Sequence, residues 1–579
     1  MSQKTVRTFL ASAGFVILAG LTSPAWANAQ KILPQADSFS GAWLAGYVAN
    51  NDSNTDIAIN YFRQALKYEP DNQLVLPDMM LTLLSAGQFD EAVPLARQLR
   101  DNVNVRRFAR LVLAADAMRR QRYMQAATSF HFQDTEVMDE LTATFFSAWA
   151  DFGAGNRQKA VERLEKSANG LEWYNLLRLY HLALLHDLAG EKQQAATCFE
   201  QAVADEKSST ITPDTYERLV ISYAIHLLQN KQKPEAIALL QNSEKKFSGR
   251  KTFYELRQQI ERGEQQQQPL VKNAVEGGAE ALYNLGSTIN RAGGEAYAYF
   301  YLQTARTLTP GNDAVHYQLA ETSAKAGKPQ QAIALYQKVS RQSPYFYDAT
   351  IRLALNESQS GAQESAIRRL EKLRRHSRDD SQIVSLLASI YMQLEQFDKA
   401  AKILGTVLDQ PSRNEQDYGS LLFQRAIAYE RLQQWNKAEP DFRKALEISP
   451  RNPQILNYLG YSLIDRDMKL DEALDMVQKA AHMMPRDGYI IDSLGWAYYK
   501  LGRYTEAVNV LEKAVKLRPQ DAAINDHLGD AYWKAERKLE ATFQWKHAIA
   551  NEPEAEELAK IRNKLAYGLK DIPSVNGQK

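Results

Sequence analysis

Cysteine is almost absent from this chain of 579 residues, which contains Cys198 alone. A single cysteine excludes an internal disulfide, so we expect Cys198 to be a small core residue. The sequence also lacks a His-Glu-x-x-His zinc pattern, a glycine-rich phosphate loop and a Gly-x-Ser-x-Gly nucleophile elbow. His181 and His186 are five positions apart, which separates them around a helix axis and makes a metal site poor. We therefore expect no catalytic, cofactor-binding or metal-binding residues.

Charge of one sign is also missing. The chain has 70 lysines and arginines against 69 aspartates and glutamates, a formal net charge of +1. This balance gives no general attraction to nucleic acid or to acidic lipid, and we expect no nucleic-acid partner. The hydrophobic content of 45% and charged content of 24% are ordinary for a soluble protein.

Long apolar runs are restricted to the N-terminus. Lys4 and Arg7 precede an apolar stretch from Phe9 to Leu21, and the small-residue pattern Ala25–Ala27 follows. This is typical of a secretory signal cleaved before Asn28, which would leave no transmembrane span in the mature chain. An uncleaved anchor helix is the alternative, but the run is shorter than the ~20 residues that a spanning helix needs. No cysteine follows the predicted cleavage site, so a bacterial lipoprotein is not expected.

An alanine that returns about every 34 residues is the strongest positive signal in the sequence. Two further alanines, Ala236 and Ala438, fill most of the gaps and give fourteen candidate units. Fourteen units of this length take up roughly 476 of the ~552 residues after the predicted signal. The remainder is too short for an appended catalytic domain of ordinary size. The periodic alanines are Ala58, Ala92, Ala126, Ala160, Ala195, Ala298, Ala332, Ala366, Ala400, Ala473, Ala507 and Ala541.

Other positions recur in register with these alanines. The clearest unit has Leu494, Gly495, Tyr498, Ala507, Ala514 and Pro519, and the next has Leu528, Gly529, Tyr532, Ala541, Ala548 and Pro553. This layout resembles the tetratricopeptide repeat family. The resemblance implies an all-α solenoid, a right-handed superhelix of helix-turn-helix units, and the breaks in the period divide it into two arrays joined by an irregular linker. Small residues such as Gly495 and Ala507 are expected where the two helices of a unit cross.

Breaks in the period predict the domain organisation. A cleaved signal peptide at 1–27 and an N-terminal segment at 28–38 precede an array of about six units at 39–249. A linker or degenerate unit at 250–278 contains Gln265–Gln268 and Gly277-Gly278, although Phe253, Leu256 and Ile260 have helical spacing. A second array of about eight units follows at 279–553. We expect a capping helix at 554–570 and a disordered tail at 571–579.

The resemblance also implies a binding surface. Proteins of this family usually hold a peptide or a partner helix in the concave groove formed by the first helix of each unit. In this chain the groove positions predict aromatic anchors and an acidic strip that would face a basic residue of the partner. We expect at least two of Tyr461, Trp496 and Trp533 to be exposed there; the alternative is that several of these rings pack within the solenoid. The predicted groove residues are Phe423, Tyr458, Tyr461, Asp492, Trp496, Tyr499, Asp526, Asp530 and Trp533.

Three functions of different classes fit the sequence. The first is a non-enzymatic exported scaffold, resembling periplasmic tetratricopeptide proteins of Gram-negative bacteria that assemble or maintain the cell envelope and contact membranes peripherally. Its partners would be cell-envelope proteins. The alternative is a periplasmic component of a machine that exports a polysaccharide or another surface polymer, since an aromatic groove also suits sugar rings. An enzyme is the third reading, and the periodic spacing shows no cluster of titratable residues to support it.

Overall fold

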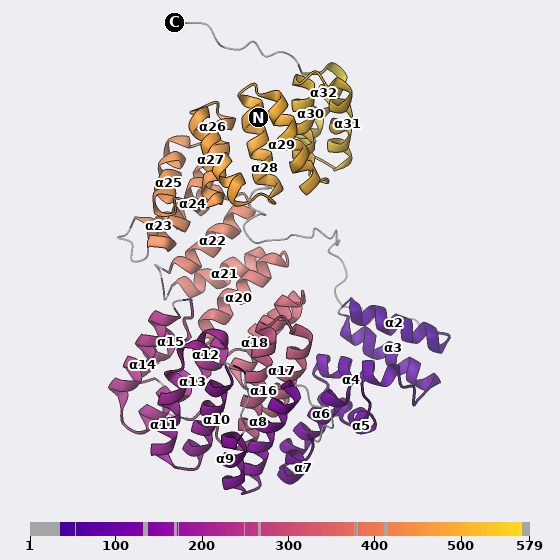
Figure 1. Ribbon diagram of the computed structural model, residues 1–579, viewed down its shortest axis with the longest axis vertical. Helices are drawn as coiled ribbons and strands as arrows, with labels where there is room; N and C mark the ends of the chain where they lie inside the picture. Colours follow the sequence, from indigo (N-terminus) through magenta and orange to yellow (C-terminus); the bar gives the residue numbers. More distant parts are fainter. Residues whose placement is uncertain are drawn as a thin grey trace. The chain divides into compact units, whose positions relative to one another are not determined.

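The described residues of the computed structural model are almost entirely helical (Figure 1). They are 35–569 except 53, 131–136, 167–170, 172, 248, 265–267, 376, 378–379 and 410–414. This part of the chain contains 31 helices and no strand. None of its helices combines the length and apolar character needed to cross a bilayer. The predicted signal peptide at 1–27 and the predicted tail at 571–579 lie outside the described residues.

Contacts divide the chain into two compact units. The N-terminal unit is Asn28–Leu373, and the C-terminal unit contains Arg374–Lys579. The predicted linker at 250–278 falls inside the N-terminal unit, so the compact division lies about a hundred residues later in the chain than the predicted junction. Within the described residues, the helices form fourteen successive pairs, with α12, α15 and α32 outside the pairs.

The N-terminal unit is built from the helices α2 to α21. Their bounds are α2 Phe39–Asn51, α3 Thr55–Tyr68, α4 Val75–Ala86, α5 Phe89–Leu99, α6 Arg106–Arg119, α7 Tyr123–Ala127, α8 Val137–Gly153, α9 Arg157–Lys166, α10 Tyr174–Leu188, α11 Lys192–Val203, α12 Glu206–Ile211, α13 Pro213–Gln229, α14 Lys233–Lys246, α15 Thr252–Arg262, α16 Ala274–Arg291, α17 Glu295–Leu308, α18 Asp313–Lys325, α19 Pro329–Tyr336, α20 Phe346–Gln359 and α21 Gln363–Arg374.

The C-terminal unit continues the same alternation of helices. Its elements are α22 Ser381–Gln393, α23 Phe397–Leu408, α24 Glu415–Arg431, α25 Trp435–Ile448, α26 Pro453–Asp465, α27 Leu470–Met483, α28 Gly488–Lys500, α29 Tyr504–Leu517, α30 Ala522–Lys534, α31 Lys538–Ala550 and α32 Ala555–Tyr567. The last helix occupies the predicted capping region, and its Ile561 is buried against the preceding pair.

Local chemistry explains where the helices begin and end. Pro485 follows α27, where proline cannot continue a helix, and Asp487 then caps α28 by accepting hydrogen bonds from the amides of Tyr489 (3.0 Å) and Ile490 (3.4 Å). Most of the tight turns between the helices of a pair contain a residue with a positive φ, such as Gly502 or Glu395. The same capping role is taken by Asn312, Asp380, Asn452 and Asp521.

Small residues stand where the helices of a pair cross, as the repeat pattern predicts. A Cβ atom added at Gly495 would lie 2.5 Å from Cγ of Leu511, and Ala507 is fully buried. At the next crossing, a Cβ at Gly529 would lie 2.4 Å from the ring of Trp545. Larger side chains at these positions would force the helices apart.

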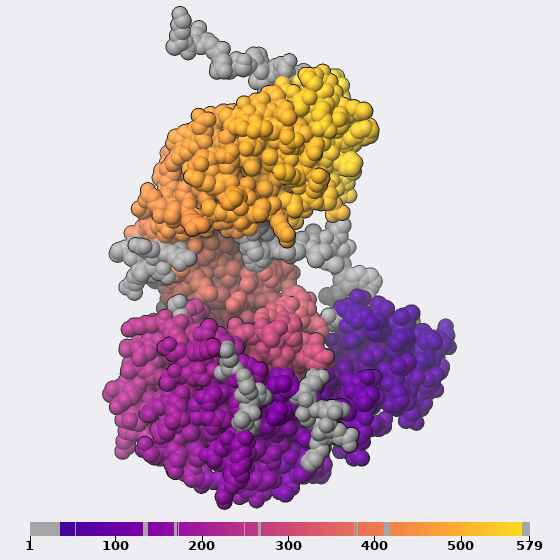
Figure 2. All heavy atoms as spheres, in the orientation of Figure 1, coloured from indigo at the N-terminus to yellow at the C-terminus, as the bar shows by residue number. Residues whose placement is uncertain are grey.

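The pair α16–α17 fills the inside of the N-terminal unit. Helix α16 packs along α8 and also contacts α6, α10 and α13, while α17 contacts α4 and α6 (Figure 1). Thr142 of α8 and Tyr301 of α17 share a hydrogen bond of 2.9 Å, and Gln303 Nε2 donates to the Ser85 carbonyl at 3.0 Å. In the space-filling view, the rose atoms of the segment that includes α17 and α18 lie against the indigo atoms of the first pairs (Figure 2).

This packing corrects the expected end of the linker. Gly277 and Gly278 do not form a loop but lie inside α16, which begins at Ala274, and both are buried. A Cβ at Gly277 would lie 2.1 Å from the Trp149 ring, so glycine is what lets α16 approach α8. The helical spacing noted at 253–262 does correspond to a helix, α15, whose Phe253, Leu256 and Ile260 are buried.

Candidate functional site

The predicted groove residues lie on the first helices of four consecutive pairs in the C-terminal unit. Helix α24 carries Phe423, α26 carries Tyr458 and Tyr461, α28 carries Asp492, Trp496 and Tyr499, and α30 carries Asp526, Asp530 and Trp533. Contacts join α26 to α28 and α28 to α30, so these first helices are neighbours along the solenoid. The structure therefore brings the predicted set together on one run of helices.

Burial corrects the expected exposure of the aromatic anchors. Tyr461 and Trp496 are only 6% and 4% exposed, so two of the three rings expected at the groove surface belong to the core. Trp533, the third ring, is half-buried. For Trp496 the physical reason is that its ring packs against His527 of the next first helix instead of projecting into the groove. Of the nine residues, the half-buried ones are Phe423, Tyr499, Asp526 and Trp533, and the buried ones are Tyr458, Tyr461, Asp492, Trp496 and Asp530.

Trp496 is the centre of a stack of three rings. Tyr499 lies on one face, with ring centroids 4.6 Å apart and planes 10° apart. The imidazole of His527, from α30, lies at 4.2 Å and 18°. Its Nδ1 is 3.0 Å from both carboxylate oxygens of Asp492. Burial opposes protonation of His527, but Asp492, with further carboxylates nearby, raises its pKa to about 9, so the ring is a cation at neutral pH.

The carboxylates of the acidic strip are paired with cations of the same chain. Lys564 of α32 donates to Asp526 (2.7 Å) and to Asp530 (2.8 Å), and the indole N–H of Trp545 donates to Asp530 at 3.0 Å. Burial raises the pKa of Asp530 to about 6, with the charge of Asp526 adding to the rise. A basic partner residue was expected opposite these carboxylates, but in the structure their cations are His527 and Lys564 of the same chain.

The sequence analysis did not identify His527 and Lys564 as partners of the groove carboxylates, although their spacing from those carboxylates indicates it. His527 follows Asp492 by 35 residues, and Lys564 follows Asp530 by 34. Opposite charges one repeat apart fall on adjacent first helices, so this spacing is the sequence signature of an ion pair along the groove wall.

The remaining groove aromatics make ring contacts or lie close to acidic side chains. Phe423 and Tyr458 form an edge-to-face pair with centroids 5.8 Å apart. Burial raises the pKa of Tyr461, and Asp465 and Asp492 add to the rise, so its hydroxyl stays protonated. Trp533 packs against Trp545 at 5.4 Å. Only the half-buried rings keep surface for a partner.

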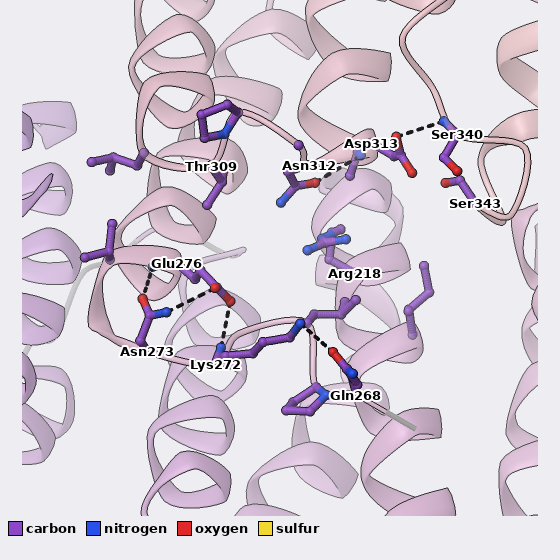
Figure 3. Close-up of a pocket in the computed structure, with 18 of the residues that line it drawn as sticks. Arg218, Gln268, Lys272, Asn273, Glu276, Thr309, Asn312, Asp313, Ser340 and Ser343 are labelled. Carbon is purple, nitrogen blue, oxygen red and sulfur yellow. Dashed lines mark hydrogen bonds between the residues drawn. The ribbon is translucent and has the colours of Figure 1, made fainter. Parts of the chain in front are cut away.

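A cavity of about 780 Å³ lies in the N-terminal unit, at a place the sequence did not indicate (Figure 3). Five segments of the chain form its walls: residues 121 and 123, α13, residues 268–276, residues 308–314 and residues 340–345. Arg218 lines the cavity and is buried. Its Nε and Nη2 donate hydrogen bonds to Glu280 at 3.0 and 2.6 Å. Tyr180 also donates to Glu280, at 3.0 Å.

In the described part of the chain, no three His, Cys, Asp or Glu side chains lie close enough together to hold a metal ion. His181 is fully buried, and its Nδ1 accepts a hydrogen bond of 3.0 Å from the Trp149 indole. Burial lowers the pKa of His181 to about 4, so it is a neutral packing residue. Cys198 is partly buried against the core, where burial raises its thiol pKa.

Comparisons with known proteins agree with the repeat pattern. A sequence model described as TPR repeat matches residues 495–535, and models described as tetratricopeptide repeat match 323–390, 357–422 and 419–452. The TPR repeat-containing protein PA4667 of Pseudomonas aeruginosa is 28% identical over 195 residues, which cover 34% of this chain. A Haemophilus influenzae protein named Lipoprotein NlpI homolog is 31% identical over 102 residues, or 17% of this chain.

The matches to the two curated relatives cover only part of this chain and part of each relative. The chain spans about a third, 32%, of the length of each of the two curated relatives. Among solved structures, a tetratricopeptide repeat protein from Parabacteroides merdae is 19% identical and covers 44% of this chain and 98% of its own, with a TM-score of 0.37.

Proposed function

Because this chain belongs to the tetratricopeptide repeat family, whose members mediate protein–protein interactions, we propose that it is an exported, non-enzymatic scaffold of the bacterial cell envelope. Scaffolds of this fold are typically non-enzymatic. The scaffold binds peptide or helix segments of envelope proteins in the groove of its C-terminal unit. The predicted secretory signal and the relative named a lipoprotein support a periplasmic location, in which this chain touches membranes only peripherally.

The observation that carries this proposal is the stack of Tyr499, Trp496 and His527. The buried Trp496 ring stacks on the half-buried Tyr499, His527 stacks on Trp496, and the ion pair with Asp492 holds the imidazole in place. Aromatic side chains that are already immobilised lose little conformational entropy on binding, which is why such residues dominate binding hot spots. The proposed contact surface is therefore Tyr499, Trp533 and Phe423, with Trp496 as their support.

The ion pairs also define what the groove accepts. Two cations, His527 and Lys564, already pair with the three groove carboxylates, so a partner does not need a basic residue to bind. Apolar anchors at helical or extended spacing are the better match for an aromatic surface whose carboxylates are already paired.

A double substitution of half-buried rings tests the proposal. Chemical crosslinking and mass spectrometry of the native envelope fraction would compare wild type with Tyr499→Ala/Trp533→Ala. Loss of specific envelope proteins in the variant is the expected result. The matched control is Leu539→Ala/Phe543→Ala on α31, whose side chains are 68% and 54% exposed, and it should retain the partners. Circular dichroism would establish that both variants keep their helices.

The other outcomes have definite meanings. An unchanged partner set in the Tyr499→Ala/Trp533→Ala variant would refute the groove as the binding site. Recovery of polysaccharide instead of protein would favour the alternative, a periplasmic component of a polymer export machine.

A further inference from the structure

We propose that α32 and the two residues after it, Gly568 and Leu569, form a displaceable cover over the Trp533 end of the groove. The inference rests on the proposed function, because it concerns how a partner gains access to the groove surface of the C-terminal unit. The cover is an autoinhibitory contact: a partner segment reaches the Trp533 ring only when this part of the chain has left it.

The chain passes closely over the Trp533 ring at Gly568. A Cβ atom added at Gly568 would lie 2.1 Å from one carbon of the six-membered ring of Trp533 and 2.6 Å from the next. Gly568 also has a φ of +71°, a backbone conformation that disfavours residues with a Cβ. Glycine meets both requirements, so the backbone at this position lies close against the ring.

Lys564 ties the same part of α32 to the groove. Its ammonium donates to Asp526 at 2.7 Å and to Asp530 at 2.8 Å. Both carboxylates belong to α30, the helix that carries Trp533 and lies beside α32 (Figure 1). The partly buried Leu565 packs against the same apolar cluster as Trp533. A charged contact and an apolar contact therefore hold the cover on the groove.

Burial indicates that α32 is held less firmly than the first helices of the preceding pairs. Over its described length α32 buries Ile561 alone, whereas α28 and α30 each bury eight residues. The side chain of Tyr567, at the end of α32, is 76% exposed. Elements with few buried contacts open at a lower free energy than the rest of a fold, so α32 can leave α30 while the pairs before it stay folded.

Opening of the cover and binding of a partner are linked. When a partner binds only the open form, its apparent Kd is the intrinsic Kd divided by the fraction of molecules that are open. Weakening the cover should therefore strengthen partner binding. A helix that only supports the end of the solenoid has the opposite effect, because its loss would disturb the groove and weaken binding.

Two release variants and two matched controls test the cover in the full chain. Gly568→Ala adds a Cβ against the Trp533 ring. Its control, Gly502→Ala, introduces similar positive-φ strain at a turn where the Cβ meets no atom within 4 Å. Lys564→Gln removes the bridging cation, and its control, Lys560→Gln, removes an exposed cation of the same helix.

Hydrogen exchange followed by mass spectrometry would measure opening. In the wild-type chain we expect the amides of α32 to exchange faster than those of α30. In Lys564→Gln they should exchange at least about tenfold faster than in Lys560→Gln, the factor for the loss of one charge-assisted hydrogen bond. Gly568→Ala should likewise exceed Gly502→Ala. Exchange of α32 as slow as that of α30, or unchanged in both release variants, would overturn the proposal.

Crosslinking in the native envelope fraction would measure binding. Both release variants should capture at least about threefold more of the envelope proteins that depend on Tyr499 and Trp533, and both controls should match wild type. Unchanged or reduced capture in the release variants would overturn the cover and would make α32 a supporting helix. Failure of the groove itself gives a different result, because Tyr499→Ala/Trp533→Ala would then lose no envelope protein.

Discussion

Gly277→Ala tests the packing of α16 inside the N-terminal unit. The added methyl group would lie 2.1 Å from two atoms of the Trp149 ring and 2.5 Å from a third, well inside the ~3.5 Å optimum for two carbons. Trp149 is fully buried and its indole N–H is held by His181, so the ring has no free space to enter. We expect overpacking to cost about 1–3 kcal/mol and the strained hydrogen bond about 1 kcal/mol more.

Helix propensity acts in the opposite direction, because alanine is favoured over glycine inside a helix by about 1 kcal/mol. The net expectation for Gly277→Ala is therefore a loss of about 1–3 kcal/mol. Gly278→Ala is the matched control, since it gains the same propensity but its Cβ meets the flexible end of Met118 at 3.2 Å and Phe146 at 3.3 Å.

Urea unfolding followed by tryptophan fluorescence would measure both variants. We expect Gly278→Ala to be neutral or slightly stabilising and Gly277→Ala to unfold at clearly lower urea. Identical urea midpoints for the two variants would refute the packing of α16 on α8 and would support the linker predicted at Gly277-Gly278.

Three further results are expected. Glu395→Gly, at a turn residue with φ +59°, should stabilise the C-terminal unit by about 0.5–1 kcal/mol in urea unfolding, because the left-handed conformation disfavours a residue with a Cβ; a loss of stability would contradict this. The pKa of His527 is raised to about 9, so the protonated imidazole should stabilise the folded state by about 3 kcal/mol. This contribution should be complete below pH 6.5 and lost as the pH rises through 9. Thermal melts of His527→Gln should lack that alkaline loss, and an identical pH profile would disprove it. Trp496→Ala should destabilise by about 3–5 kcal/mol, since the ring is core; an unchanged melting curve would show it to be surface.

The repeat pattern allowed the fold to be predicted because each unit repeats the same local demands. Ala507 and Gly495 must be small where two helices cross, and Pro485 must follow a helix end. These demands act within about 34 residues, so they appear in the sequence as a period. The predicted all-α repeat solenoid is confirmed.

The features that the repeat pattern did not predict depend on contacts between units far apart or adjacent in the solenoid. Gly277 resembles a linker residue in the sequence, and only the position of Trp149, more than a hundred residues earlier, explains it. Trp496 occupies a groove position, yet His527 from the next unit covers its face. The cavity of the N-terminal unit is lined by five separate segments, which no periodicity reveals.

The measurement that tests the central claim most directly is photo-crosslinking from the groove. A photoreactive phenylalanine analogue would replace Tyr499 in one variant and Phe543, exposed on α31, in another, and each would be irradiated in the native envelope fraction. The groove scaffold predicts protein adducts from position 499 that position 543 does not give. The same adducts from both positions, or adducts from position 543 alone, would contradict a partner-binding groove in the C-terminal unit.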